Sequence, residues 1–117
     1  MNVHENRALD YLGHIDQAIE RIFRYTEDLD EIGFSRDQLI QDAVIRNIEI
    51  IGEASRNLQR QCPDFVASHP ELPLRAANEM RNALAHAYFK VEIDVVWRTI
   101  ESDLPGLCEQ VRAILKS

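Results

Sequence analysis

The stretch LIQDAVIRNIEIIGEASRNL, residues 39–58, decides the fold of this chain. Its apolar residues recur at alternating steps of three and four, which places them on one face of an α-helix. We expect this helix to cover residues 36–60, with Ser35 as its N-cap and Gln38 completing a capping box. Its buried stripe is predicted to comprise Leu39, Ile40, Ala43, Val44, Ile48, Ile51, Ala54 and Leu58.

Two further residues of this helix, Ile45 and Ile50, widen the apolar stripe beyond a single face. A chain of 117 residues is also too short to bury its apolar surface fully on its own. Both observations favour a homodimer in which this helix provides an apolar contact surface.

The same helical spacing continues on both sides of that stretch, and no segment alternates as a strand would. Residues 31–34 read as a turn, and Pro63 ends the second helix. Residues 63–73 are expected to form an irregular connection with one short turn at Asp64–Ser68. Pro105 either kinks the helix before it or, as we favour, opens a short last helix with Asp103 near its cap. The expected helices cover residues 5–30, 36–60 and 92–103. A further helix is expected to start near Pro73 and to include Leu84, and the last one to include Leu107 and Leu115.

This pattern predicts an all-α fold, an antiparallel up-and-down bundle of four main helices plus a short C-terminal helix, in one domain over residues 1–117. Gly13 lies inside the first helix, where glycine costs roughly 1 kcal/mol relative to alanine. No apolar run approaches the roughly 20 residues that span a bilayer. The N-terminal residues also lack the pattern of a signal peptide, so we expect a cytoplasmic protein.

The cysteines and histidines do not indicate a disulfide or a metal site. Cys62 and Cys108 lack the CxxC spacing of a metal or redox site, and in a cytoplasmic chain they are expected to be buried thiols. The four histidines show no helical pairing with another ligand, so no metal site is predicted.

The net charge of −7 is unevenly distributed. Residues 10–53 hold eleven acidic and four basic residues, whereas residues 56–98 hold five acidic and six basic ones. Salt-driven affinity for nucleic acid should therefore be weak, which excludes a protein that coats RNA stoichiometrically. An enzyme that cleaves RNA and dissociates remains compatible with this distribution.

The segment Arg81-Asn82-Ala83-Leu84-Ala85-His86-Ala87-Tyr88 gathers a guanidinium, an amide, an imidazole and a phenol. At about 100° per residue, Arg81 and Tyr88 lie about 20° apart on a helix, but Arg81 and His86 lie about 140° apart. One straight helix would not direct both Arg81 and His86 at one small site. Either the helix breaks between them, or the site is assembled against a second copy of the chain.

These side chains suit the cleavage of an RNA phosphodiester. A histidine takes the proton from a ribose 2′-hydroxyl or returns one to the leaving 5′-oxygen, and an arginine stabilises charge on the phosphate, so that no metal is required. Structural alternatives remain open. His86 could be a packing residue, Arg81 could pair with a carboxylate such as Glu79 of a neighbouring copy, and Tyr88 with Phe89 could be a pair of aromatics at the edge of the core.

The motif Arg81-Asn82-x-x-x-His86-x-Tyr88 resembles the RN-x-x-x-H-x-Y signature of HepT-type toxins, which are helical ribonucleases of the HEPN superfamily. Four flanking blocks agree with the family pattern, and the resemblance covers nearly the whole chain. These blocks are Asp42-Ala43-Val44, Ile51-Gly52-Glu53-Ala54, Val96-Trp97-x-x-Ile100 and Asp103-Leu104-Pro105. One departure is Leu74, which stands where the family often has a tryptophan.

The resemblance implies a dimeric helical bundle in which the motifs of both subunits meet in a cleft. Arg81 and His86 would be the catalytic pair of a metal-independent, cofactor-free endoribonuclease, and Asn82 would position a neighbour or the phosphate. Glu53 is expected to face the same cleft and restrain Arg81. Arg75 and Lys90 are the further candidates for contact with RNA.

The family also implies a partner, a minimal nucleotidyltransferase antitoxin that transfers AMP from ATP to the motif tyrosine, here Tyr88. The charged adduct would occupy the anion site and repel RNA. Both transfer RNA and messenger RNA remain open as substrates. The alternative function is a non-catalytic RNA- or nucleotide-binding module, or a helical adaptor that partners a nucleotidyltransferase.

Overall fold

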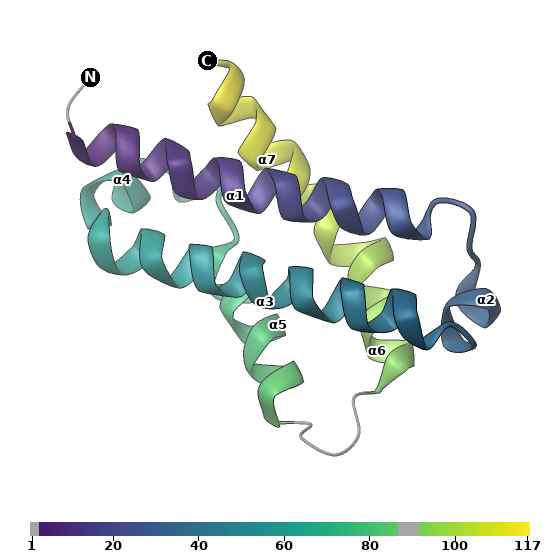
Figure 1. The fold of residues 1–117 in the computed structure, drawn as a ribbon. Coiled ribbons are helices and arrows are strands. Elements are labelled where there is room, and N and C mark those ends of the chain that lie inside the picture. Colours follow the sequence, from purple (N-terminus) through teal and green to yellow (C-terminus); the bar gives the residue numbers. More distant parts are fainter. Residues whose placement is uncertain (1–2, 87–91) are drawn as a thin grey trace.

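Two long helices form the main axis of the fold. In this computed structural model, which describes residues 3–86 and 92–117, helix α1 spans Val3–Thr26 and helix α3 spans Gln38–Gln61. The two helices lie side by side and run in opposite directions (Figure 1). The described residues form helices and no strand, which confirms the predicted all-α class.

The connection between α1 and α3 differs from the prediction. Residues expected to form a turn instead make a short helix, α2 (Glu31–Ser35), whose Gly33 N–H donates to the Asp30 carboxylate over 2.7 Å. The prediction that Ser35 caps the next helix is wrong. The Ser35 hydroxyl donates to the Ile32 carbonyl at the end of α2, and Asp37 caps α3 by accepting from the Ile40 N–H over 3.0 Å.

The core lies between α1, α3 and the C-terminal half of the chain. Most of the stripe predicted for α3 is buried, but Leu39 is 80% exposed, so that part of the prediction is wrong. Leu39 and Ile48 are nine residues apart, which places them on opposite sides of a helix. The fully buried large side chains are Leu12, Ile15, Ile19, Ile22, Phe34, Val44, Ile48, Ile51, Leu58, Val96, Leu104 and Leu107.

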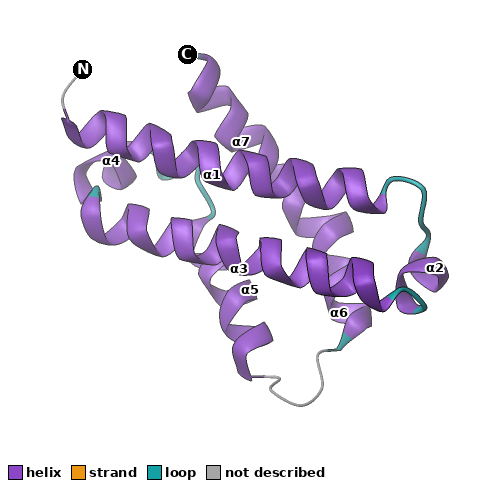
Figure 2. Cartoon of the chain, viewed as in Figure 1, coloured by secondary structure: helices purple, strands orange, loops and turns teal. Residues whose placement is uncertain are grey.

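The C-terminal part begins with a short helix, α4 (Pro63–Ser68), in the segment where one short turn was expected. Helix α5 (Leu74–His86) packs against α3. After residues 87–91 the chain continues as α6 (Ile93–Arg98), a π-helical turn η1 (Thr99–Asp103) and α7 (Leu104–Lys116) (Figure 2).

The predicted fourth and last helices are therefore joined rather than separate. The Leu104 N–H donates to the Thr99 carbonyl, five residues back, and Pro105 lies in the first turn of α7. Pro105 has no N–H to continue an α-helical ladder. The wider turn lets the chain pass the proline without ending the helix.

Side-chain contacts fasten the C-terminal half to the long helices. The rings of Phe34 and Trp97 lie 5.3 Å apart between centroids, and the Arg112 guanidinium donates to the Asp16 carboxylate over 2.7 Å. Cys62 and Cys108 are buried thiols. Within residues 3–86 and 92–117, no helix is long and apolar enough to cross a bilayer.

Candidate functional site

Helix α5 carries most of the predicted site. It runs without interruption from Leu74 to His86, so it passes through both Arg81 and residue 86. The first explanation for the angle between Arg81 and His86, a helix break between them, is therefore wrong. On this continuous helix the two positions lie about 140° apart, and the second explanation, assembly against a second copy, stays a prediction.

Arg81 is half-buried, and its aliphatic stem lies against Gly52 of α3. A Cβ at residue 52 would lie 2.6 Å from Arg81 Cδ and 2.9 Å from Arg81 Cγ, and closer still to Arg81 Cβ. Carbon atoms at optimal contact are about 3.5–4.0 Å apart. The absence of a side chain at Gly52 is thus what lets α5 bring Arg81 against α3.

A hydrogen bond fixes the same helix pair one turn away. The half-buried Asn78 amide on α5 donates to the Gln59 side-chain oxygen on α3. Arg81 and Asn78 are three residues apart on α5, so they lie on neighbouring parts of one helix face. Together the two contacts determine both the distance and the rotation of α5 relative to α3.

The outer side of α5 carries Arg75, whose side chain is 91% exposed and pairs with Glu79 over 3.3 Å. Residue 86 is eleven positions after Arg75, so the helical register places it about 20° from Arg75 around the axis. Arg81 lies about 120° from Arg75. The outer side of α5 therefore presents Arg75 and position 86, whereas Arg81 belongs to the side that faces α3.

The other predicted site residues lie in different places. Glu53 is exposed on α3, directly after the glycine that contacts Arg81. Asn82 and His86 belong to α5, but their side chains, like all of Tyr88 and Lys90, lie outside the described residues. Among the described residues, the ion pairs are Arg46–Glu49, His69–Glu71, Arg75–Glu79 and Arg112–Asp16.

Neither Arg81 nor Glu53 takes part in those ion pairs, and no hydrogen bond to another described side chain holds the Arg81 guanidinium. Within the chain Glu79 pairs with Arg75. That Glu79 of a neighbouring copy pairs with Arg81 stays a prediction. That Glu53 restrains Arg81 stays a prediction. Within one subunit the described surroundings leave the Arg81 guanidinium available for an anion.

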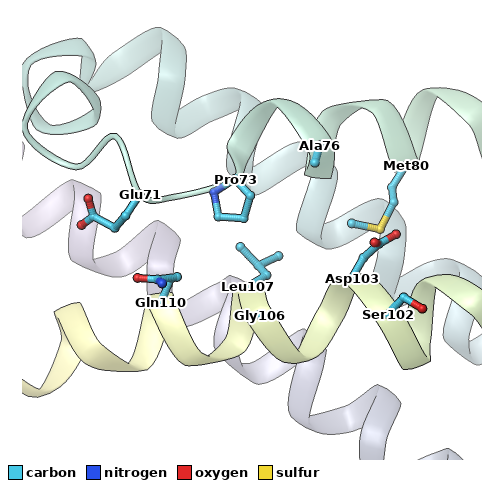
Figure 3. A pocket seen from close by; sticks show the side chains of 9 residues that line it. All are labelled: Glu71, Pro73, Ala76, Met80, Ser102, Asp103, Gly106, Leu107 and Gln110. Carbon is cyan, nitrogen blue, oxygen red and sulfur yellow. The ribbon is translucent and has the colours of Figure 1, made fainter.

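A groove opens on the third side of α5, where it meets η1 and α7. It consists of two adjoining hollows of about 310 and 290 Å³ that share Ala76, Met80 and Asp103. Figure 3 shows Met80 of α5 and Asp103 of η1 lining it from opposite sides. The ionisable residues that line the two hollows are Glu71, Glu79 and Asp103, all acidic.

This acidic groove does not suit a phosphate, because like charges repel in a confined space. The basic residues Arg75 and Arg81 lie on the other sides of α5. No group of three or more histidine, cysteine, aspartate or glutamate side chains that could hold a metal ion occurs in the described part of the chain. An anion would therefore be bound at the α3–α5 contact or on the outer side of α5, where the basic residues lie.

Sequence reasoning assigned no role to Gly52. A signal was present, because glycine is unfavourable inside a helix and an isolated one often has a packing reason. Gly13 carries the same signal, yet a Cβ at residue 13 would meet nothing within 4 Å. Only the position of α5 distinguishes the two glycines.

The chain matches the family described as "Ribonuclease HepT-like" over residues 15–114. This chain belongs to the HepT-like ribonuclease family. The matched residues include α3, α5 and the whole described part of the site, so the HepT-like match and the geometry concern the same elements.

Relatives of this HepT-like chain carry ribonuclease names. The "Probable ribonuclease HepT" of Thermococcus cleftensis is 46% identical over 98 residues, which cover 84% of this chain and 86% of the relative. "Putative RNase TTE0752" of Caldanaerobacter subterraneus is 35% identical over 106 residues, 91% of this chain and 92% of the relative.

A third relative places the same domain in a longer protein. "Gamma-glutamylcyclotransferase and putative RNase MJ0434" of Methanocaldococcus jannaschii is 40% identical over 106 residues, 91% of this chain but 46% of the relative. No solved structure matches the chain.

Proposed function

We propose that the protein is a metal-independent endoribonuclease toxin of a toxin–antitoxin system, with its active site shared between two copies of the chain. The observation that carries the proposal is the family membership of a chain whose α5 passes unbroken through Arg81 and His86. Because the two positions point to different sides of one helix, a second subunit is needed to bring an arginine and a histidine to one phosphate.

The chemistry follows from the two residue types. His86 accepts the proton of a ribose 2′-hydroxyl, whose oxygen attacks the adjacent phosphorus. The bond from phosphorus to the 5′-oxygen breaks, and that oxygen takes a proton as it leaves, so that a cyclic phosphate and a free 5′-hydroxyl result. Arg81 stabilises the negative charge that builds up on the non-bridging oxygens. Asn82, Glu53, Arg75 and Lys90 keep the supporting roles predicted above.

The first experiment is cleavage of transfer RNA and messenger RNA by the purified protein in excess EDTA. We expect cleavage by the wild type and none by His86→Ala, with both proteins equally helical by circular dichroism. Cleavage that requires added metal would contradict metal independence. RNA binding without turnover over long incubation would instead favour the non-catalytic binding module.

The shared site is tested by mixing two inactive variants. Arg81→Ala and His86→Ala subunits, unfolded and refolded together, form mixed dimers in which one of the two composite sites keeps both residues. Random pairing of a two-fold dimer should then restore roughly a quarter of the wild-type rate. Each variant refolded alone is the control. A mixture as inactive as its components would show that both residues act within one subunit.

The proposed neutralisation is AMP transfer to Tyr88 by a nucleotidyltransferase antitoxin. It is supported by the sequence motif and by the chemistry of a charged adduct beside an arginine. Intact-mass measurement after co-expression with the neighbouring gene should give a protein heavier by AMP units that no longer cleaves RNA, and Tyr88→Phe should stay unmodified. An unchanged mass for the wild type would rule out this regulation.

A further inference from the structure

We propose that Gly52 is the positioning residue for Arg81, because the absence of a side chain at this position of α3 fixes where the guanidinium lies. This inference rests on the proposed function, since it concerns the same cleavage site. It assigns a role to a residue that makes no contact with substrate. Gly52 would act on the reaction entirely through the placement of α5.

The atoms involved leave little room for adjustment. The three nearest atoms to a Cβ at residue 52 are all Arg81 carbons, including Cγ at 2.9 Å and Cδ at 2.6 Å. A new rotamer could move Cγ and Cδ, but Arg81 Cβ is attached to the backbone and is the nearest of the three. Relief of that contact therefore requires movement of α5 itself.

The helix is also held against sliding. Asn78, one turn before Arg81, is hydrogen-bonded to Gln59 of α3, and the preceding residue, Ala77, is buried. Separation or rotation of α5 is then the response that remains for an added methyl group at residue 52. Since ordinary carbon contacts are about 3.5–4.0 Å, the displacement required is on the order of 1 Å.

A displacement of this size matters for catalysis more than for folding. The Arg81 guanidinium has no ion pair among the described residues, so its position is set by the packing of its stem. A misplacement of about 1 Å at a reacting centre can lower the rate on the order of 10²-fold. Arg81 stabilises charge that develops in the transition state, so the loss should appear in kcat more than in KM.

The test compares two identical substitutions, Gly52→Ala and Gly13→Ala. Both replace a glycine inside a long helix, but a Cβ at residue 13 meets nothing within 4 Å. In the RNA cleavage assay, with rates divided by the folded fraction, we expect Gly52→Ala to lose on the order of 10²-fold in kcat with KM nearly unchanged. Gly13→Ala should keep the wild-type kcat. Equal kcat values for the two variants would overturn the proposal.

A second measurement covers the case in which Gly52→Ala folds poorly. Gly52→Ala is also introduced beside Arg81→Gly, which removes the three atoms nearest to the new methyl group. We expect Gly52→Ala to lower the melting temperature of the wild type but not that of Arg81→Gly. The same lowering in both backgrounds would show that Arg81 is not the contact concerned. If the wild type does not cleave RNA, the proposed function fails. The thermal comparison still decides whether the space at Gly52 is needed for the Arg81 side chain.

Discussion

The two contacts made by α3 differ in kind. Against α1, helix α3 forms part of the apolar core, to which both helices contribute fully buried aliphatic side chains such as Ile51 and Ile19, and one hydrogen bond joins Arg21 to Asn47. Against α5, its contacts include a glycine that makes room for an arginine stem and a side-chain hydrogen bond that Asn78 donates to Gln59. Toward α1 the contact includes large apolar groups, whereas toward α5 the missing side chain at Gly52 lets the second helix approach closely.

This difference suggests that one contact governs the stability of the fold and the other governs the position of α5. Aliphatic burial stabilises a fold in proportion to the area removed from water and tolerates small shifts. A contact built on a missing Cβ and a hydrogen bond contributes less free energy but allows fewer geometries. We therefore expect the α1–α3 contact to determine how stable the protein is, and the α3–α5 contact to determine how well it cleaves RNA.

The largest effect on stability is expected from Ile19→Ala in the part of the apolar core that α1 contributes. Ile19 is fully buried, and such a truncation costs about 2–5 kcal/mol in the free energy of unfolding. Urea denaturation measures this loss. RNA cleavage per folded molecule should stay at the wild-type value. A large fall in that value would contradict the proposal that the α1–α3 contact governs stability and not cleavage.

Asn78→Ala is expected to lower stability less than Ile19→Ala does, but to lower the rate of RNA cleavage more. Loss of the hydrogen bond to the half-buried Gln59 should cost about 1 kcal/mol, while cleavage per folded molecule should fall several-fold because α5 is less firmly held. The matched control is Arg21→Met, which removes the 3.0 Å hydrogen bond from Arg21 to Asn47 between α1 and α3. If both variants lower the cleavage rate equally, the two contacts do not differ as proposed.

Gly13→Ala should raise stability by roughly 1 kcal/mol, since alanine is the better helix former and its Cβ meets nothing within 4 Å. The gain should appear as a higher urea midpoint at unchanged slope. A loss of stability here would mean that a glycine in α1 also serves a close contact, contrary to the contrast drawn with Gly52.

The smallest effect concerns Glu71, on the connection that leads into α5. A hydrogen bond with His69 over 2.8 Å lowers the pKa of the Glu71 carboxyl below its ordinary value of 4.5. Because the folded pKa is the lower one, the stabilisation is present above pH 4.5 and is lost as the pH falls through the folded pKa. NMR titration should show the Glu71 pKa rising toward 4.5 in His69→Ala, and an unchanged pKa would show that another group is responsible.

Much of the fold could be predicted from apolar spacing, because a buried stripe on a long helix leaves a strong periodic pattern. The helix boundaries were harder. Both Ser35 and Asp37 are acceptable N-caps, and the choice between them depends on Phe34, whose burial against Trp97 holds α2 in place. The prediction that Leu39 is buried was wrong because an apolar residue at the start of a helix need not lie on the same face as the apolar residues after it.

The candidate site was predictable in its residue types but not in its arrangement. The spacing of Arg81 and His86 indicated that a single straight helix could not direct both at one point, and the structure keeps that helix intact. The role of Gly52 could not be read from the chain, because Gly13 looks equivalent until α5 is in place. Contacts between elements distant in sequence leave no periodic signal.

The π-helical turn at Thr99–Asp103 has a consequence for chain length. Such a turn holds one residue more than an α-helical turn, so it takes up the extra residue without rotating the helix that follows. Deletion of a single residue there would shorten it to an α-helical turn and leave Cys108 and Val111 in their buried positions, but it would press the Pro105 ring against the preceding turn. The extra residue therefore accommodates the proline, and the buried face of α7 does not depend on it.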